Sequence, residues 1–427
     1  MVGAMYLGKG GDDPASECDE LAADAYAQAV VAYTRDGRYA HGLEICASVA
    51  GVYAQAGEPR LAAAIYLSVA HAYTHAAKSD LEVAAPGTRP NWHSLAAEAY
   101  EMAAAIYDDA GFPEQVAHAY AQAAAAYMRG GLHEEAANTY TRVAQICNQI
   151  ATAYEQAAKA DNWAGLDQKA FAMASEARAA YVLAGKAYEM AAKEHGAKPL
   201  GLPSLAAQVD ERAAQAYENA GEHQLAANAY MRAGEGYSAS HDKRAVEVYE
   251  KAVAAYTRAG RRNLVAKATE RLAQAHERIA QGHEQAAENY QRVAESRKRA
   301  AEDDKRAPKS SEVATAYEEA AKAFERAEKA AEEAAKGYAR AAKTYKKART
   351  AYADAGLPEQ ATAVSSLAVQ ADEKAQKAAA RASQDQAVET YEEAATAYEE
   401  AGMPGRAARA RARAEEAKKA KNARRAE

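Results

Sequence analysis

Cysteine is scarce in this chain of 427 residues, which has only three: Cys18, Cys46 and Cys147. An odd number cannot pair completely within one chain, and Cys46 and Cys147 lie in apolar, helix-like stretches. The pattern therefore disfavours a disulfide framework of the kind that small secreted domains use. We expect a reducing, cytoplasmic setting, in which these two thiols are buried as small apolar groups.

Long uncharged apolar runs are also missing. The longest, Leu61–Ala77, is rich in alanine and is interrupted by Ser68, His71, Thr74 and His75. The start of the chain shows no basic segment followed by an apolar one, which is the pattern of an export signal. We predict neither an export signal nor a membrane span.

Phenylalanine, tryptophan and β-branched runs are scarce or missing. The chain has 3 Phe and 2 Trp, and it contains no β-branched run of strand length. Alanine is abundant instead, tyrosine occurs 27 times, and the 10 prolines lie almost wholly in loop-like places. Because alanine is the strongest helix former and proline the strongest helix breaker, this composition predicts an all-α fold.

Recognisable catalytic and metal-binding motifs are absent. None of the 11 histidines follows a glutamate by three residues, which is the spacing of helical dimetal sites. The segment HEEAA at His133 has Ala137 where a zinc-protease helix needs its second histidine, and LGKGGDD (7–13) lacks the Gly-Lys-Ser/Thr ending of a phosphate loop. His71 and His75 share a helical face and could jointly bind a metal, but no third ligand is evident, so we favour packing or solvation. We expect no catalytic residue, no metal and no cofactor.

Charge is distributed unevenly along the chain. The formal net charge is −7, yet residues 1–160 hold 9 basic and 19 acidic side chains, and the remainder holds 44 and 41. The final segment, 405–427, has nine basic and three acidic residues. The sequence thus has an acidic front and a basic end.

One spacing recurs: a tyrosine followed by a glycine four residues later. Glycine readily adopts the left-handed conformation that closes a helix, so each pair predicts a helix end. In four cases a proline follows two residues after the glycine, at the expected first position of the next helix. The pairs are Tyr33/Gly37, Tyr53/Gly57, Tyr107/Gly111, Tyr127/Gly131, Tyr217/Gly221, Tyr256/Gly260, Tyr352/Gly356 and Tyr398/Gly402.

The residues after these turns extend the pattern to a helical hairpin. Tyr127 ends one expected helix, Gly131 turns the chain, and Ala136 and Tyr140 face back from the next helix. This Tyr-x3-Gly-x4-Ala-x3-Tyr pattern resembles the middle of a tetratricopeptide repeat, and the repeated AAxAYxxAG phrase is similar to the soluble NSF-attachment-protein family. The resemblance covers about residues 20 to 260, with a weaker echo at 352 to 411. It implies a right-handed superhelix (solenoid) of antiparallel helical hairpins.

The chain also departs from both families. Insertions at 85–93 and 198–204 break a strict tetratricopeptide period, and the tryptophan position of that repeat is not met. The phenylalanine pair and the leucine-bearing C-terminus of an attachment protein are missing. The resemblance therefore does not imply recruitment of an ATPase.

From Arg261 onward, apolar residues repeat every seven positions. Sustained heptads predict two long helices that pair as an antiparallel coiled hairpin. His276 and His283 form a row beside the first heptad and are expected to flank its seam. The two heptad rows are Val265, Leu272, Ile279, Ala286 and Val293, then Tyr317, Phe324, Ala331, Tyr338, Tyr345 and Tyr352.

These patterns divide the chain into four parts. We predict a flexible N-terminal tail (1–16), a tetratricopeptide-like repeat array (17–260), a long antiparallel helical hairpin (261–355) and a terminal helical hairpin with a basic tail (356–427).

The expected function is that of a non-catalytic cytoplasmic scaffold or adaptor, whose repeat surface binds a protein partner of unknown identity. A row of tyrosine hydroxyls could read a peptide or helix, although packing between helices is the alternative that we favour for any single tyrosine. The candidate contact residues are Tyr33, Tyr53, Tyr107, Tyr127 and Tyr217.

The basic end suggests a second function. Its cations surround the expected helix instead of forming one face, so we expect this helix to project freely and to contact an anionic surface. That surface is either the acidic front of another copy, which would give self-assembled rings or filaments, or nucleic acid or an anionic membrane. A solvated helix end is the alternative. The candidate residues are Arg406, Arg409, Arg411, Arg413, Lys418, Lys419, Arg424 and Arg425.

Overall fold

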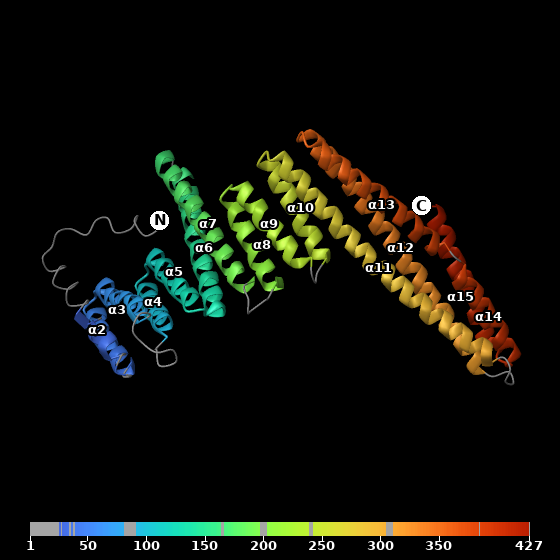
Figure 1. Ribbon diagram of the computed structural model, residues 1–427, viewed down its shortest axis with the longest axis horizontal. Helices are drawn as coiled ribbons and strands as arrows, with labels where there is room; N and C mark the ends of the chain where they lie inside the picture. The colour runs from blue at the N-terminus through green and yellow to red at the C-terminus, as the bar shows by residue number, and fades with distance from the viewer. Residues whose placement is uncertain are drawn as a thin grey trace. The chain divides into compact units, whose positions relative to one another are not determined.

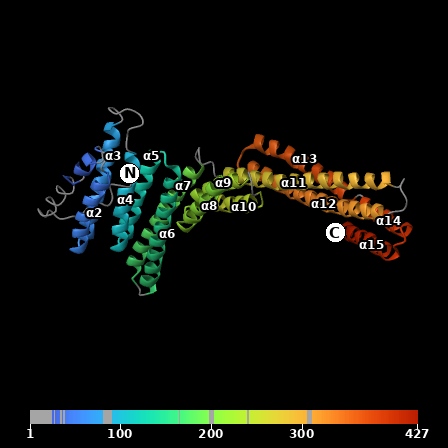
Figure 2. The ribbon, with the colours of Figure 1, turned by 90° about the horizontal axis from the view of Figure 1, so that it is seen from below.

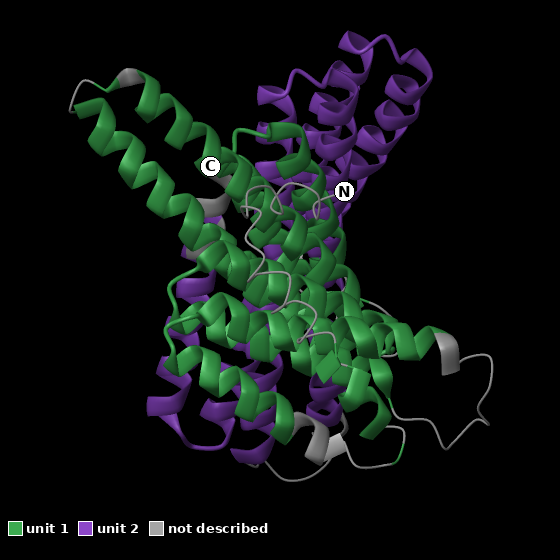
Figure 3. Cartoon of the chain, turned by 90° about the vertical axis from the view of Figure 1, so that its left-hand side faces the viewer, with its two compact units in different colours: residues 1–237 green, residues 238–427 purple. Residues whose placement is uncertain are grey.

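The computed structural model describes residues 25–26, 28–33, 36, 39–80, 91–163, 166–196, 203–238, 242–304, 311–383 and 385–426. The predicted N-terminal tail, together with Cys18 and Gly37, lies outside this set. The described residues form helices and the turns between them, with no strand. Two compact units divide the chain, residues 1–237 and 238–427 (Figure 3). The predicted all-α fold is confirmed, and the four-part division of the chain stays a prediction.

In the first unit, each helix packs against the next one along the chain (Figure 1). This is the arrangement of a helical-repeat solenoid. The helices are α2 (Tyr39–Gln55), α3 (Pro59–Asp80), α4 (Trp92–Asp109), α5 (Pro113–Arg129), α6 (His133–Trp163), α7 (Asp167–Gly196), α8 (Pro203–Asn219) and α9 (His223–Tyr237).

The second unit is built on two long helices, α11 and α12, of 43 and 44 residues. At 1.5 Å per residue each is about 65 Å long. The helices of this unit are α10 (Asp242–Arg258), α11 (Arg262–Asp304), α12 (Ser311–Asp354), α13 (Pro358–Ala382), α14 (Gln386–Glu400) and α15 (Pro404–Ala426).

The Tyr-x3-Gly pairs end helices as predicted, wherever the structure describes both residues. Gly131, for example, has φ +72°, and the N–H of Leu132 donates to the carbonyl of Tyr127 at 3.0 Å. This bond closes the last turn of α5, and α6 begins at the next residue, His133. The N–H of Gly131 also donates, to the carbonyl of Met128 at 3.1 Å, so the turn satisfies the carbonyls of both Tyr127 and Met128.

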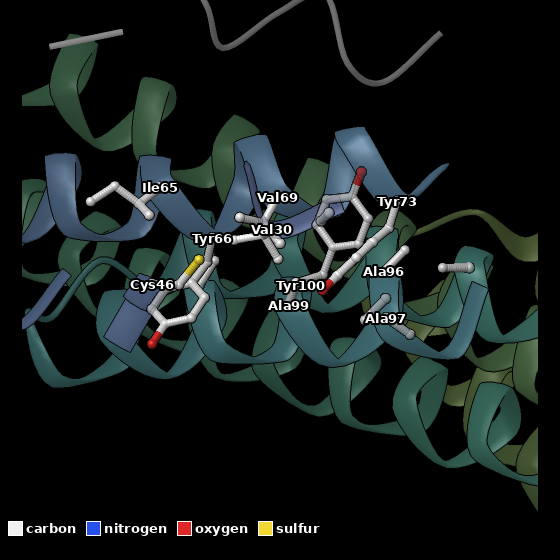
Figure 4. Close-up of a cluster of buried hydrophobic side chains, with 14 of the residues drawn as sticks. Val30, Cys46, Ile65, Tyr66, Val69, Tyr73, Ala96, Ala97, Ala99 and Tyr100 are labelled. Atoms are coloured by element: carbon white, nitrogen blue, oxygen red, sulfur yellow. The ribbon is translucent and has the colours of Figure 1, made fainter. Parts of the chain in front are cut away.

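Alanine and tyrosine together fill the core between helices. Tyr66 and Tyr73 of α3 are buried, and Figure 4 shows Tyr66 beside Cys46 of α2 and Tyr73 beside Tyr100 of α4. Ala96 of α4 is fully buried in the same cluster. Methyl groups let the helices approach closely enough for a ring of one helix to cover the next, so few large aliphatic side chains are needed.

The long hairpin forms as predicted, but its seam lies one residue away from the expected row of α11. Val265 and Leu272 are only partly buried and Val293 is exposed, whereas Ala266, Ala273 and the alanines that continue at sevens are buried. The tyrosine row of α12 is the reason, because its rings occupy the space between the helices and leave room only for methyl groups opposite. Gly337 shows how close the approach is, since a Cβ there would lie 2.8 Å from that of Ala280.

The opposite side of α12 is covered by α13 and then by α14, one after the other along its length (Figures 1 and 2). Where α13 gives way to α14, the tyrosine heptad of α12 is interrupted by Ala331. A small cavity lined by Ala331, Gln291, Arg381 and Gln386 lies at this point, with room for about one water molecule. The missing ring makes space for the turn between the two shorter helices.

Candidate protein-interaction surface

Tyrosine hydroxyls in the helix interfaces donate to glutamates on a helix earlier in the chain, at O–O distances of 2.6 to 3.4 Å. The pairs are Tyr127 to Glu101, Tyr154 to Glu114, Tyr217 to Glu189, Tyr230 to Glu218, Tyr237 to Glu211, Tyr338 to Glu284, Tyr345 to Glu277, Tyr352 to Glu270, Tyr391 to Glu325 and Tyr398 to Glu318.

Burial and the facing carboxylate both keep these hydroxyls protonated. Burial and, next, the charge of Glu325 together raise the pKa of Tyr391 to about 12. The pKa values of Tyr217 and Tyr345 are raised for the same two reasons. These three tyrosines are thus donors at physiological pH, and the glutamates that face them are acceptors.

Three of these pairs form a regular ladder between the antiparallel helices α11 and α12. Steps of seven up α11 meet steps of seven down α12, at Glu270 with Tyr352, Glu277 with Tyr345 and Glu284 with Tyr338. One step further, α12 has Ala331 and α11 has Gln291, which line the same cavity. Glutamate is therefore replaced by a neutral side chain at the step where the hydroxyl is missing.

A cation from a third helix completes several pairs. We call the resulting unit a Tyr–Glu–cation triad. Its three members come from three different helices: the glutamate helix precedes the tyrosine helix in the chain, and the cation helix follows the tyrosine helix. A carboxylate shared in this way is satisfied on both sides in a half-buried setting. The cations are Arg232 on Glu189, Lys374 on Glu277 at 2.6 Å, Arg381 on Glu284 at 3.3 Å and Arg413 on Glu318 at 2.9 Å.

The triad of α7, α8 and α9 contains one further acid, Asp210. Its side chain is buried, and Arg232 donates to it at 2.9 Å. Burial raises the pKa of Asp210 to about 6, although the charge of Arg232 acts in the opposite direction. The negative charge of nearby Glu189, which shares the same guanidinium, also raises the pKa of Asp210.

The five candidate contact tyrosines are placed in two different ways. Tyr127 and Tyr217 are 8% and 1% exposed, and both donate to glutamates inside the fold. Tyr33, Tyr53 and Tyr107 are half-buried, so part of each ring faces solvent. Packing accounts for the first two, while Tyr53 and Tyr107 pack against the core with part of their surface and expose the rest.

Tyr53 and Tyr107 end α2 and α4, two helices that both pack on α3. The two turns are joined through Arg60 of α3, which lies 4.9 Å from the ring centroid of Phe112, and that ring contacts Tyr107 edge-on. We call this region the turn edge: Tyr53, Arg60, Tyr107 and Phe112.

Two exposed apolar side chains accompany the turn edge on the same helices. Val52 of α2 is 66% exposed and Met102 of α4 is 43% exposed. Sequence reasoning missed both, because only the repeated tyrosines were weighed as contact residues. The available signal was that Val52 and Met102 are larger apolar residues within otherwise alanine-rich helices.

The basic end behaves differently from the prediction. Instead of projecting freely, α15 packs on α14 through a row of buried alanines, Ala407, Ala410 and Ala414. The prediction considered only how the cations surround the helix, and so it missed this row. Three small residues at i, i+3 and i+7 share one face and are enough for close helix packing.

Several of the predicted anion-contacting cations are held within the fold. Arg413 pairs with Glu318 and Arg411 pairs with Glu399 at 2.7 Å, while Arg406 lies over the ring of Tyr398. Arg409, Lys418 and Lys419 are exposed. The side chains of Arg424 and Arg425 lie outside the described residues.

Candidate metal and nucleophile residues show no assembled site in the described ranges. No group of three His, Cys, Asp or Glu side chains there could hold a metal, and exposed His71 packs edge-on against Tyr100. Cys46 and Cys147 are buried free thiols, and burial raises the pKa of each to about 11. Such thiols are poor nucleophiles at neutral pH. Among the helices that the structure describes, none is long and apolar enough to cross a bilayer.

Comparison with known proteins confirms the resemblance seen in the sequence. A model of the soluble NSF attachment protein (SNAP) family matches residues 203–298, from the start of α8 into α11. A search of curated protein sequences finds no match.

Two solved structures are similar to longer stretches of the chain. One is a circular tandem repeat protein, with 13% identity, a TM-score of 0.26 and coverage of 96% of this chain and 99% of that chain. The other is a signal-transduction ATPase of the STAND class with a tetratricopeptide repeat sensor, from Pyrococcus horikoshii, with 14% identity, a TM-score of 0.22 and coverage of 82% and 52%. At TM-scores this low, neither structure supports an inference about function.

Proposed function

We propose that the chain is a non-catalytic scaffold or adaptor that binds a protein partner at the turn edge of the first unit. The observation that carries this proposal is the exposure of Val52 and Met102 on the two helices that end near half-buried Tyr53 and Tyr107. Exposed apolar and aromatic side chains that lie close to one another are typical of protein contact surfaces.

The charges around the turn edge indicate the chemistry of the partner. Glu58, Asp108 and Asp109 are exposed at the two turns, and Arg60 is occupied by the ring of Phe112. The surface therefore combines apolar groups, three acids and the cation of Arg60, and its excess of acidic groups suits a partner segment with apolar and basic residues. The match to an attachment-protein family is consistent with binding to another protein.

Affinity purification from the native cell, with the full chain as bait, tests the proposal. We expect a partner that is lost with Val52→Asp and Met102→Asp but retained with Val369→Asp, because Val369 is similarly exposed but lies on α13 in the second unit. Recovery of the chain alone, or equal recovery of the partner with all three variants, would contradict it.

Self-assembly through the acidic front and basic end is a second candidate, and the exposure of Arg409, Lys418 and Lys419 on α15 supports it. Nucleic acid or an anionic membrane are other ligands for the same cations. We expect oligomers in light scattering at low salt that dissociate as salt rises, since exposed charges are screened within about 8 Å at physiological ionic strength. Replacing the three cations by Gln should abolish these oligomers; unchanged scattering would exclude a role for α15.

A further inference from the structure

In the second unit, α10 covers only the first part of α11. It has 17 residues and α11 has 43, and the turn at Gly260 joins them so that α10 runs back along the start of α11 (Figure 1). Arg278 marks the end of this cover, because its guanidinium donates at 2.7 Å to Oγ of Ser238, which precedes α10. Residues 279–302 of α11 then continue beyond α10 for about 36 Å at 1.5 Å per residue.

The row of α11 that lies under α10 consists of alanines. Ala268 and Ala275 are fully buried, although they do not belong to the row of Ala266 and Ala273 that faces α12. Two positions on a helix point about 200° apart, so the two rows face nearly opposite sides of α11. Besides α12, α10 is the described helix that packs extensively on α11, and it covers the first row.

The same row is uncovered beyond the end of α10. At steps of seven it continues as Gly282, Asn289 and Ser296, and all three are exposed. A Cβ at Gly282 would meet nothing within 4 Å, whereas a Cβ at Gly337 of α12 would lie 2.8 Å from that of Ala280. Glycine is unfavourable within a helix, and at Gly337 it allows a neighbouring helix to approach closely. Gly282 offers the same close approach, and the space above it is open.

One flank of this row is apolar. Ile279 and Ala286 are partly buried and Val293 is 45% exposed, and their spacing of seven places them on one face. Tyr290, which is 39% exposed, lies between this flank and the side that packs on α12. We call this surface the α11 seat, and it consists of Ile279, Gly282, Ala286, Asn289, Val293 and Ser296.

The other flank of the seat is basic. Arg292 and Arg299 are exposed and seven residues apart. Arg292 forms no ion pair with the described residues, and Arg299 approaches Glu295 only to 3.9 Å. Two further acids of this stretch, Glu284 and Glu288, lie on the side of α11 where a cation of α13 pairs with both. The seat itself contains no acidic side chain, so its two arginines are available to an acidic partner.

We propose that the α11 seat binds an amphipathic helix of another protein, which continues along α11 the position that α10 holds on its first part. The central face of this helix is small and apolar, and its acidic flank pairs with Arg292 and Arg299. Among the described helices α10 makes no extensive contact with α12, so a helix in line with it meets the rows of α11. The acid of α12 nearest the seat, Glu319, is held by Arg297 at 3.4 Å.

The charge pattern favours such a partner over a second copy of this chain. In an antiparallel pair of identical helices, equal flanks face each other, so the row of Arg292 and Arg299 would face the same row of the other copy. Like charges in that position oppose association. The seat is independent of the turn edge and of the basic end, so its failure would leave both of those proposals standing.

Two synthetic peptides test the seat in the full chain. Both have the sequence of α10; the acidic probe has its four cations replaced by Glu, and the basic probe has its three acids replaced by Lys. By fluorescence anisotropy we expect the parent to bind the acidic probe at least about tenfold more tightly than the basic one. Gly282→Leu should weaken binding of the acidic probe at least about tenfold by filling the seat, while circular dichroism shows undiminished helix content and thermal stability. Equal binding of the two probes, or no effect of Gly282→Leu, would overturn the proposal.

Charge reversal gives a second, separate measurement. We expect Arg292→Glu with Arg299→Glu to invert the preference between the probes, and Lys343→Glu with Lys347→Glu, at exposed positions of α12, to leave it unchanged. Dimers of the parent in sedimentation velocity that Gly282→Leu abolishes would assign the seat to a second copy and overturn the proposal. Binding of duplex DNA that depends on the two arginines, without binding of the acidic probe, would assign them to nucleic acid and overturn it as well.

Discussion

The hydroxyl of Tyr345 donates to Oε2 of Glu277 at 2.9 Å, although 68 positions separate the two residues. The bond joins α12 to α11, and Lys374 of α13 reaches the other oxygen of the same carboxylate at 2.6 Å. A single glutamate thus fixes the register of three helices, which alanine packing alone would specify poorly.

Removing the hydroxyl of Tyr345 should weaken the second unit measurably. We expect Tyr345→Phe to lower the free energy of unfolding by about 1 kcal/mol, because one hydrogen bond is lost while Lys374 still satisfies Glu277. Tyr290, which is exposed on α11, is the matched control, and its change to Phe should have no effect. Urea denaturation followed by circular dichroism measures both, and equal midpoints would contradict a role for the bond.

Gly185 of α7 is a place where a single methyl group should destabilise the first unit. A Cβ there would lie 2.6 Å from Cε1 of Tyr217, whose ring is buried. We expect Gly185→Ala to cost about 1–3 kcal/mol through overpacking. Gly282→Ala on α11, where a Cβ meets nothing within 4 Å, should instead be neutral or stabilise by up to about 1 kcal/mol. If thermal unfolding shows the same change for both, helix propensity and not packing is responsible.

The network around Asp210 makes stability depend on pH. Its pKa is raised from 3.8 to about 6 in the folded state, chiefly by burial, so the folded chain holds this proton more tightly than the unfolded chain. The stabilisation is complete below about pH 4 and is lost as pH rises through about 6. We expect the first unit to become less stable over this interval, and Asp210→Asn to flatten the dependence.

Tryptophan fluorescence follows this transition, because Trp92 and Trp163 both lie in the first unit. Asp108→Asn, at an exposed position, should leave the pH dependence as it is. Parallel curves for the parent and Asp210→Asn would show that the proton is bound elsewhere.

Tyr127 distinguishes packing from recognition. Because its ring is buried, we expect Tyr127→Ala to lower the free energy of unfolding by about 3 kcal/mol or more. Val52→Ala on the exposed surface should change stability by less than about 0.5 kcal/mol. A normal melting curve for Tyr127→Ala would return this residue to the set of partner contacts.

Sequence reasoning predicted the helix ends well because they depend on local chemistry. Gly131 and its counterparts need only their own turn to close a helix, and the sequence carries that information within five residues. The seam of the long hairpin was less predictable, since Val265 and Leu272 looked more suitable for burial than the alanines beside them. Which row of α11 faces α12 depends on the space that the rings of α12 occupy. The sequence of α11 alone carries no information about those rings.

The glutamate partners of the tyrosines were harder to predict from the sequence. Tyr352 and Glu270 are 82 positions apart, and the chain has many exposed glutamates from which to choose. A signal was nevertheless present, because Glu270, Glu277 and Glu284 repeat with the same period as the tyrosines of α12.

The Tyr–Glu–cation triads also constrain how a chain of this kind can change length. Each triad takes its three members from different helices, so insertion or deletion of one helix would separate a glutamate from its tyrosine or from its cation. An unpartnered, half-buried carboxylate costs about 1–3 kcal/mol. A gain or loss of two helices together keeps the order of donors and acceptors intact. We therefore expect relatives of this chain to differ in length by whole hairpins, with single-helix changes confined to the ends.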